Sequence, residues 1–136
     1  MEETMRLKVF NAFLLSILLF SLPEVYSVDV NKGREYFIGH CIGCHAFACN
    51  KEGPSLGGLF GRKAGSAEGY EAYYSDELKN YGVVWDEDTL DEWFTDPGKI
   101  VVSVMAQSGK IDDAVQRQEV IAFLKTEDPT INLCPQ

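Results

Sequence analysis

The sequence predicts an all-α domain of three or four helices around a loop-rich middle. Apolar residues recur at helical spacing near both ends of the chain, which indicates amphipathic helices. Between them, residues 46–72 are rich in glycine, and their apolar residues follow neither helical nor strand spacing. A small domain with so long an irregular stretch is unusual, and its helices alone leave little core between them. We therefore expect a large bound group to complete the core.

The first half of the domain contains one long and one short predicted helix. The first covers residues 29–41, and either Asp29 or Asn31 can cap its start. The loop of residues 46–72 follows, and a short helix is expected over residues 75–80. The inner face of the first helix is formed by Val30, Gly33 and Phe37.

The second half adds an extended segment and two helices. Residues 83–85 (VVW) are predicted to be extended, and Asp86 or Asp88 caps the helix after them. This helix stops before Pro97, and the last helix begins at Asp112 and ends at a proline, Pro129. The apolar positions of the two helices are Leu90, Trp93 and Phe94, then Val120, Phe123 and Leu124.

The N-terminal segment has the layout of a cleaved secretory signal. Two basic residues precede an apolar run, residues 9–22, which Pro23 breaks. The run is shorter than the roughly 20 apolar residues of a membrane span, so an uncleaved anchor is the weaker interpretation. Residues 25–27 (VYS) suit a signal peptidase, so we expect residues 1–27 to be removed, leaving residues 28–136 as the mature domain.

The composition restricts the possible partners. The chain carries 12 basic against 21 acidic residues, a formal net charge of −9. Such a surface repels the phosphates of nucleic acids. It favours small molecules, or proteins that present a basic face.

Residues 41–45 (CIGCH) form the motif with the most specific chemistry. In covalent haem attachment, the thiols of Cys41 and Cys44 add to the haem vinyl groups and His45 ligates the iron. A redox dithiol uses the same two cysteines, but normally after a strand in a βαβ pattern, which is not visible here. A structural zinc site needs four ligands, typically with a second pair of cysteines or histidines further along the chain, and beyond residues 40–49 the only candidate is the lone Cys134. We therefore favour haem c.

With this motif in place, the chain resembles the class I c-type cytochromes, the small electron carriers of mitochondria and of the bacterial periplasm. The resemblance runs from about Gly33 to Leu124, in five blocks that occur in the family's order. The blocks are Gly33 and Phe37 before CIGCH; Gly53–Leu56 (GPSL); Leu59–Gly65 (LFGRKAG); Val83–Leu90 (VVWDEDTL); and Val120–Leu124 (VIAFL). The resemblance implies the class I cytochrome c fold, with three to five helices around one covalently attached haem.

The resemblance also implies an iron ligand on each face of the haem. His45 supplies one, and Met105 is the only methionine downstream of the signal segment. A methionine opposite a histidine raises the reduction potential. Other interpretations are that Met105 fills a gap in the core, or that Lys99 or Lys110 competes for the iron.

Four further residues match family positions around the haem. The resemblance implies that the carbonyl of Pro54 orients the haem histidine. It implies that Arg62, Tyr74 and Trp85 donate hydrogen bonds to the haem propionates, which need such partners when buried. The alternative is a surface arginine and two core aromatic residues. Trp93 is expected to pack in the core.

These expectations describe a soluble, monomeric one-electron carrier of the periplasm that transforms no substrate. Its donor would be a larger redox protein such as a cytochrome bc-type complex, and its acceptor a terminal oxidase or reductase. The alternative is a gas sensor or weak peroxidase with an open iron site, if Met105 does not bind. A third interpretation is a haem domain that serves one fixed oxidase, and it differs from the electron carrier only in its partner.

Two cysteines remain after haem attachment, Cys49 and Cys134. In an oxidising compartment an even pair favours a disulfide. Cys134 follows the last helix, which we expect to cross the first near the haem motif, with Phe37 against Phe123. Such a bond would stabilise the fold by about 4 kcal/mol in the chain-entropy model. Free thiols, or pairing between molecules, are the alternatives.

Overall fold

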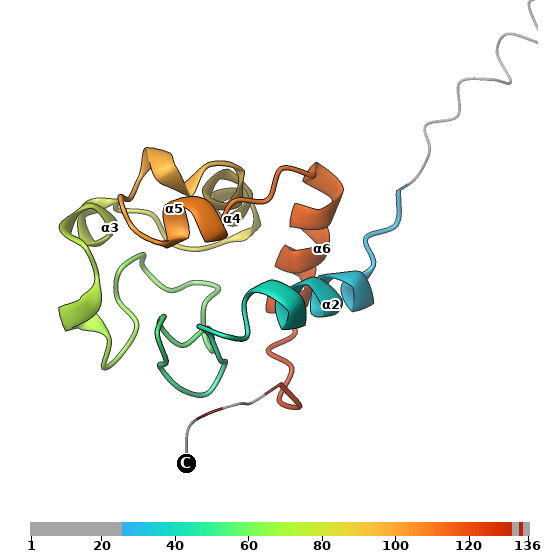
Figure 1. Cartoon of the computed structure of the whole chain (residues 1–136), viewed down its shortest axis with the longest axis horizontal. Helices are drawn as coiled ribbons and strands as arrows, with labels where there is room; N and C mark the ends of the chain where they lie inside the picture. Colours follow the sequence, from blue (N-terminus) through green and yellow to red (C-terminus); the bar gives the residue numbers. More distant parts are fainter. Residues whose placement is uncertain (1–25, 132–133, 135–136) are drawn as a thin grey trace, which may run out of the picture.

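The computed structural model describes residues 26–131 and Cys134, and it confirms the all-α class. Helices α2 and α6 cross on one side of the molecule, and α3, α4 and α5 lie on the other (Figure 1). Within the described residues, the one bridge between extended segments joins Lys63 to Val84, where an extended segment was expected. The helices are α2 (Val30–His40), α3 (Asp76–Asn80), α4 (Glu87–Thr95), α5 (Met105–Ser108) and α6 (Ala114–Leu124), with 3-10 turns η1 (Glu71–Tyr73) and η2 (Pro97–Lys99).

The crossing of α2 and α6 depends on the missing side chain of Gly33. A Cβ atom at this position would lie 1.9 Å from the backbone oxygen of Glu119 and 2.9 Å from the Cβ of Phe123. Phe37 packs one turn further along, with its ring centroid 5.4 Å from that of Phe123. The predicted contact is confirmed, and it fixes the end of α2 from which the CIGCH motif emerges.

Side-chain caps set where the helices begin. The carboxylate of Asp29 accepts a hydrogen bond from the Asn31 amide at the start of α2. At the start of α4, Asp86 and Thr89 form a reciprocal capping box. Of the alternatives that the sequence left open, Asp29 and Asp86 are therefore the caps.

The expected limits of the last helix were wrong at both ends. Its cap is Asp113 rather than Asp112, because the Asp113 carboxylate accepts from the Gln116 amide. The helix ends at Leu124, before Pro129, because the next turn tightens and Glu127 takes a positive φ of 48°. Backbone geometry, and not the proline, terminates it.

Helix α5 and the turns η1 and η2 were not predicted. Each is three or four residues long, which is too short to show a period in the sequence. Helix α5 begins at Met105, the residue that the resemblance implies as the second iron ligand.

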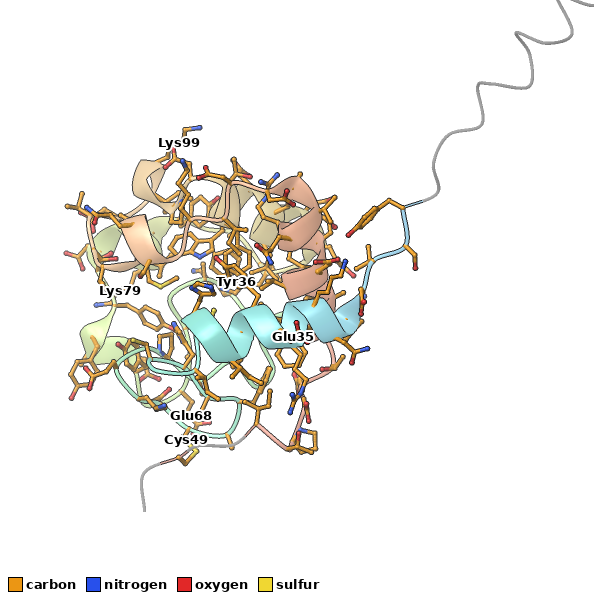
Figure 2. The ribbon with its side chains drawn as sticks, turned by 45° about the vertical axis from the view of Figure 1, so that its right-hand side comes forward. Glu35, Tyr36, Cys49, Glu68, Lys79 and Lys99 are labelled. Atoms are coloured by element: carbon orange, nitrogen blue, oxygen red, sulfur yellow. A yellow bond between two sulfur atoms is a disulfide. The ribbon has the colours of Figure 1, made fainter. Side chains whose placement is uncertain are left out.

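Cys49 and Cys134 form a disulfide in the structure, with Cα atoms 6.0 Å apart. Figure 2 labels Cys49 at the lower edge of the molecule. Of the predicted signal segment, residues 1–27, only Tyr26 and Ser27 lie within the described residues. Among the described helices, none is long and apolar enough to cross a membrane.

Candidate functional site

A cavity of about 410 Å³ lies between the α2–α6 side of the molecule and the side formed by α3, α4 and α5. Its lining is mostly apolar and aromatic. Tyr36 and Phe37 of α2 face it from one side, and Trp93 of α4 from another. All eight residues that the sequence analysis assigned to the site line this cavity: Cys41, Cys44, His45, Pro54, Arg62, Tyr74, Trp85 and Met105.

The imidazole of His45 is held in one orientation. Its Nδ1 lies 2.9 Å from the carbonyl oxygen of Pro54. Because a carbonyl can only accept, Nδ1 carries the proton and the lone pair is on Nε2. Burial lowers the pKa of His45, against the opposing effect of the Pro54 hydrogen bond. The ring is therefore the neutral imidazole that a metal requires, with Nε2 available as ligand.

The backbone of Gly53 packs directly on this ring. A Cβ atom at Gly53 would lie 2.3 Å from Cε1 of His45 and 2.7 Å from Nε2. The amide of Gly53 also donates to the carbonyl of Cys44 at 2.8 Å. Glycine is needed here for close approach of the backbone.

The two thiols of the motif do not resemble a reactive dithiol. Burial, with a smaller effect of Cys44, raises the pKa of the Cys41 thiol to about 11. Redox Cys-x-x-Cys pairs instead lower a thiol pKa, because the thiolate is the nucleophile. Among the residues that the structure describes, no three His, Cys, Asp or Glu side chains gather as a metal site.

Met105 enters the cavity from the side of α5 and is partly buried. Its methyl carbon lies 2.6 Å from the position that a Cβ atom on Gly109 would occupy. The two lysines that could compete as ligands do not line the cavity: Lys99 pairs with Asp96, and Lys110 with Asp112.

Arg62 contributes a guanidinium group that lacks a carboxylate partner in the cavity wall. Its terminal nitrogens donate to the carbonyls of Ser55 (2.8 Å) and Gly57 (3.0 Å). Its Nε is buried without a hydrogen-bond partner. Burial lowers the pKa of this guanidinium, which still titrates too high to lose its charge near neutral pH. A buried donor of this kind suits an anionic group of a ligand.

The two aromatic residues predicted to donate to the propionates, Tyr74 and Trp85, are both at least partly buried. Tyr74 is half-buried, and its hydroxyl accepts from the Ala67 amide at 3.3 Å, whereas Tyr73 is 76% exposed. Trp85 is 7% exposed and packs against Trp93, with ring centroids 5.6 Å apart. Trp93 is a core residue, as expected.

Sequence reasoning missed two side chains, one that braces the motif and one that braces the loop after it. Lys51 donates from Nζ to the carbonyl of Ile42, inside CIGCH, at 2.6 Å. Asn50 accepts from the Ser55 amide at 2.7 Å and donates to the carbonyl of Glu68 at 2.9 Å. Both residues lie in an aperiodic loop, where no pattern in the sequence signals the contact.

Known proteins resemble this chain over most of its length. It is 40% identical over 100 residues to cytochrome c of Gibberella zeae, a match that covers 71% of this chain and 92% of the relative. It is 38% identical over 102 residues to cytochrome c of Arabidopsis thaliana (73% and 89%). It is 37% identical over 125 residues to cytochrome c2 of Blastochloris viridis (89% and 93%). No model of a protein family matches the chain. The chain belongs to the class I c-type cytochromes.

Membership of this family implies a haem c cofactor, and the cavity of this cytochrome fits one. The oriented Nε2 of His45 provides a metal ligand beside two cysteines in the attachment spacing. The Nε of Arg62, which has no hydrogen-bond partner among the described residues, provides a donor for the propionates at the edge of a haem. Aromatic and aliphatic side chains enclose the rest, as an apolar ring system requires.

Proposed function

We propose that this cytochrome carries single electrons on one haem c, attached through Cys41 and Cys44. The observation that carries the proposal is the meeting, in one cavity, of eight residues spread from Cys41 to Met105. When bound, the haem supplies an iron that alternates between two oxidation states. The protein's own task is to hold the group in apolar surroundings so that little rearranges when the electron moves.

We propose that His45 and Met105 would be the two residues that hold the iron. The tautomer set by Pro54 leaves Nε2 of His45 as the donor on one side. Met105 is the one thioether in the lining, and the ion pairs of Lys99 and Lys110 keep both amines outside the cavity. Ligation by a methionine keeps the potential higher than ligation by a second nitrogen.

We propose that Arg62, Tyr74 and Trp85 hold the propionate edge. Arg62 has the strongest support, because its buried Nε has no partner among the described residues. The Tyr74 hydroxyl accepts one hydrogen bond and retains its own proton for donation. Burial, the largest cause, raises the pKa of Tyr74, so this proton remains in place at neutral pH.

We infer that the protein is exported to the periplasm, where haem is attached and the Cys49–Cys134 disulfide forms. The layout of residues 1–27 supports export. A cut after Ser27 would remove Tyr26, whose hydroxyl donates to the buried carboxylate of Glu119 at 2.7 Å. N-terminal sequencing of the exported protein locates the cut, and thiol alkylation of the intact holoprotein tests the disulfide.

We propose that the electron donor and acceptor are larger redox proteins with a basic face, such as a cytochrome bc-type complex and a terminal oxidase or reductase. Without residues 1–27 the protein keeps 10 basic and 18 acidic residues, and this net charge of −8 attracts such partners from a distance. Steering of this kind raises the association rate and weakens with salt. Electron transfer that quickens steadily as salt is added would contradict it.

Covalent attachment is tested by expression with a cytochrome c maturation system. The parent chain should retain haem after denaturation and acid extraction, whereas Cys41→Ala combined with Cys44→Ala should lose it. Haem that stays covalent in the double variant would refute the assignment. Ligation is tested separately in Met105→Ala, which should lose the charge-transfer band at the red end of the oxidised spectrum and bind CO rapidly when reduced. Rapid CO binding by the parent chain at neutral pH would instead favour a gas sensor or weak peroxidase.

A further inference from the structure

Lys51 places an ammonium group on the CIGCH motif itself. Its Nζ donates to the carbonyl oxygen of Ile42 at 2.6 Å, and Ile42 lies between the two cysteines of the motif. The side chain of Lys51 is partly buried, so its charge is held at one place with reduced access to water. A charge in such surroundings acts on its neighbours more strongly than one in bulk water.

This ammonium also lies at the negative end of helix α2. Cys41 is the C-cap of α2, and the carbonyl of Ile42 comes directly after it. Carbonyls at the C-terminus of a helix lack partners within the helix and carry a partial negative charge. Lys51 binds one such carbonyl, so it offsets this negative charge at the point where the motif leaves the helix.

The charge of Lys51 is not cancelled by an acidic side chain. Among the described residues, no carboxylate lies within ion-pair distance of Lys51, not even that of its exposed neighbour Glu52. Most of the other described lysines do have such a partner: Lys32 pairs with Glu119, Lys79 with Asp76, Lys99 with Asp96, Lys110 with Asp112 and Lys125 with Glu87. A positive charge without a counter-charge therefore sits on the motif of an otherwise acidic protein.

The effect of this charge extends to the imidazole of His45. Burial is the largest cause of the lowered pKa of His45, the Pro54 hydrogen bond opposes it, and the Lys51 ammonium lowers the pKa further. Lys51 does so because it repels a second positive charge on the ring. The same repulsion opposes a positive charge that develops on any group bound at this ring.

We propose that Lys51 is a positioning residue for the redox reaction, and that its fixed charge raises the reduction potential of the haem that His45 holds. The oxidised form of the bound group carries one more positive charge than the reduced form, and a nearby ammonium disfavours it. One electron passes to the partner redox protein, and no bond forms or breaks. This inference rests on the proposed function.

Three variants separate the charge of Lys51 from its bracing hydrogen bond. Lys51→Arg keeps both, Lys51→Gln keeps a neutral donor, and Lys51→Met removes both. In Lys51→Gln and Lys51→Met, the equilibrium constant for electron exchange between the holoprotein and a reference couple should shift about threefold toward oxidation. This shift is a potential lower by about 28 mV, at 59 mV per tenfold for one electron. Lys51→Arg should restore the potential of the parent.

Lys63→Gln is the matched control. Lys63 is exposed and forms no ion pair among the described residues, so the control makes the same change in net charge away from the motif. We expect its shift to be less than a third of that of Lys51→Gln. The control's shift should fade at high salt, whereas that of Lys51→Gln should persist because its charge is partly buried.

Two results would overturn the proposal. The first is a potential that falls in Lys51→Met but not in Lys51→Gln, which would assign the effect to bracing. The second is an equal shift in Lys51→Gln and Lys63→Gln, which would assign it to net charge. The red-end charge-transfer band should match that of the parent in every variant, and its loss in Lys51→Gln would also assign the effect to bracing. A chain that holds no covalent haem would refute the proposed function, whereas a haem protein whose potential ignores Lys51→Gln would refute only the role of Lys51.

Discussion

The two walls of the cavity that carry the proposed iron ligands are held in different ways. On the His45 wall, contacts join residues about nine positions apart: Lys51 with Ile42, Pro54 with His45, and Gly53 with Cys44. On the Met105 wall, the hydrogen bonds described for residues 101–109 stay local, such as Ala106 with Ser103 and Gly109 with Met105.

This difference implies different freedoms for the two ligands. Displacing His45 breaks contacts between separate turns of the loop, so the imidazole is preorganised before any group binds. Displacing Met105 moves a short helix whose hydrogen bonds travel with it. We therefore expect the Met105 bond to be the weaker point, and an open iron site to arise without unfolding the His45 wall.

The largest effect is expected where α2 crosses α6, because this crossing positions the whole His45 wall. Gly33→Ala would place a Cβ atom 1.9 Å from the backbone oxygen of Glu119, so the helices must separate. We expect a loss of about 3 kcal/mol or more in the free energy of unfolding, measured by denaturant titration of the holoprotein.

The control for this variant lies on the same helix. A Cβ atom on Gly39 would have nothing within 4 Å, so Gly39→Ala should raise stability by about 0.5–1 kcal/mol through helix propensity alone. Equal effects at the two glycines would contradict the close crossing.

The next effect compares the walls directly, with one substitution beside each ligand. Gly53→Ala brings a Cβ atom within 2.3 Å of the His45 ring, which is pinned by Pro54. We expect a loss of about 2–3 kcal/mol and a poor yield of holoprotein, measured from the ratio of haem to protein. Gly43→Ala is the matched control, because a Cβ atom there meets nothing within 4 Å.

On the other wall, Gly109→Ala brings a Cβ atom within 2.6 Å of the methyl group of Met105 and 2.8 Å of its backbone oxygen. The methionine side chain can move aside, but the backbone oxygen can retreat only if the short helix shifts, so we expect a loss of about 1–2 kcal/mol in stability. The red-end charge-transfer band should weaken all the same. A loss of stability greater than that of Gly53→Ala would reverse the proposed order of the walls.

The smallest effect concerns the ion pair between Arg34 of α2 and Asp128, at 3.1 Å. Hydrogen bonds from Thr130, and then the contact with Arg34, lower the pKa of Asp128 below its ordinary 3.8. Its contribution is therefore complete above that pH and is lost as the pH falls through the lowered value. Asp128→Asn should reduce Tm by about 1–2 °C at pH 7. The difference from the parent should disappear near pH 2, and one that grows toward low pH would contradict this sign.

The sequence by itself determined the helical class and the family, and it named the candidate residues of the site. CIGCH has a spacing that few chemistries share, and periodicity marked α2, α4 and α6 because each is long enough to show a face. The eight site residues that the motif and the resemblance named all line one cavity.

Only the tertiary structure decided how those residues meet. Three features lie in segments where apolar residues show no periodic spacing. They are the hydrogen bonds by which Lys51 braces the motif and Asn50 the loop after it, the contact of Gly53 with His45, and the short helix that begins at Met105. Their positions follow from backbone turns and from packing between distant segments. A pattern in the sequence records which face of a helix is buried, but not which atom it meets across the core.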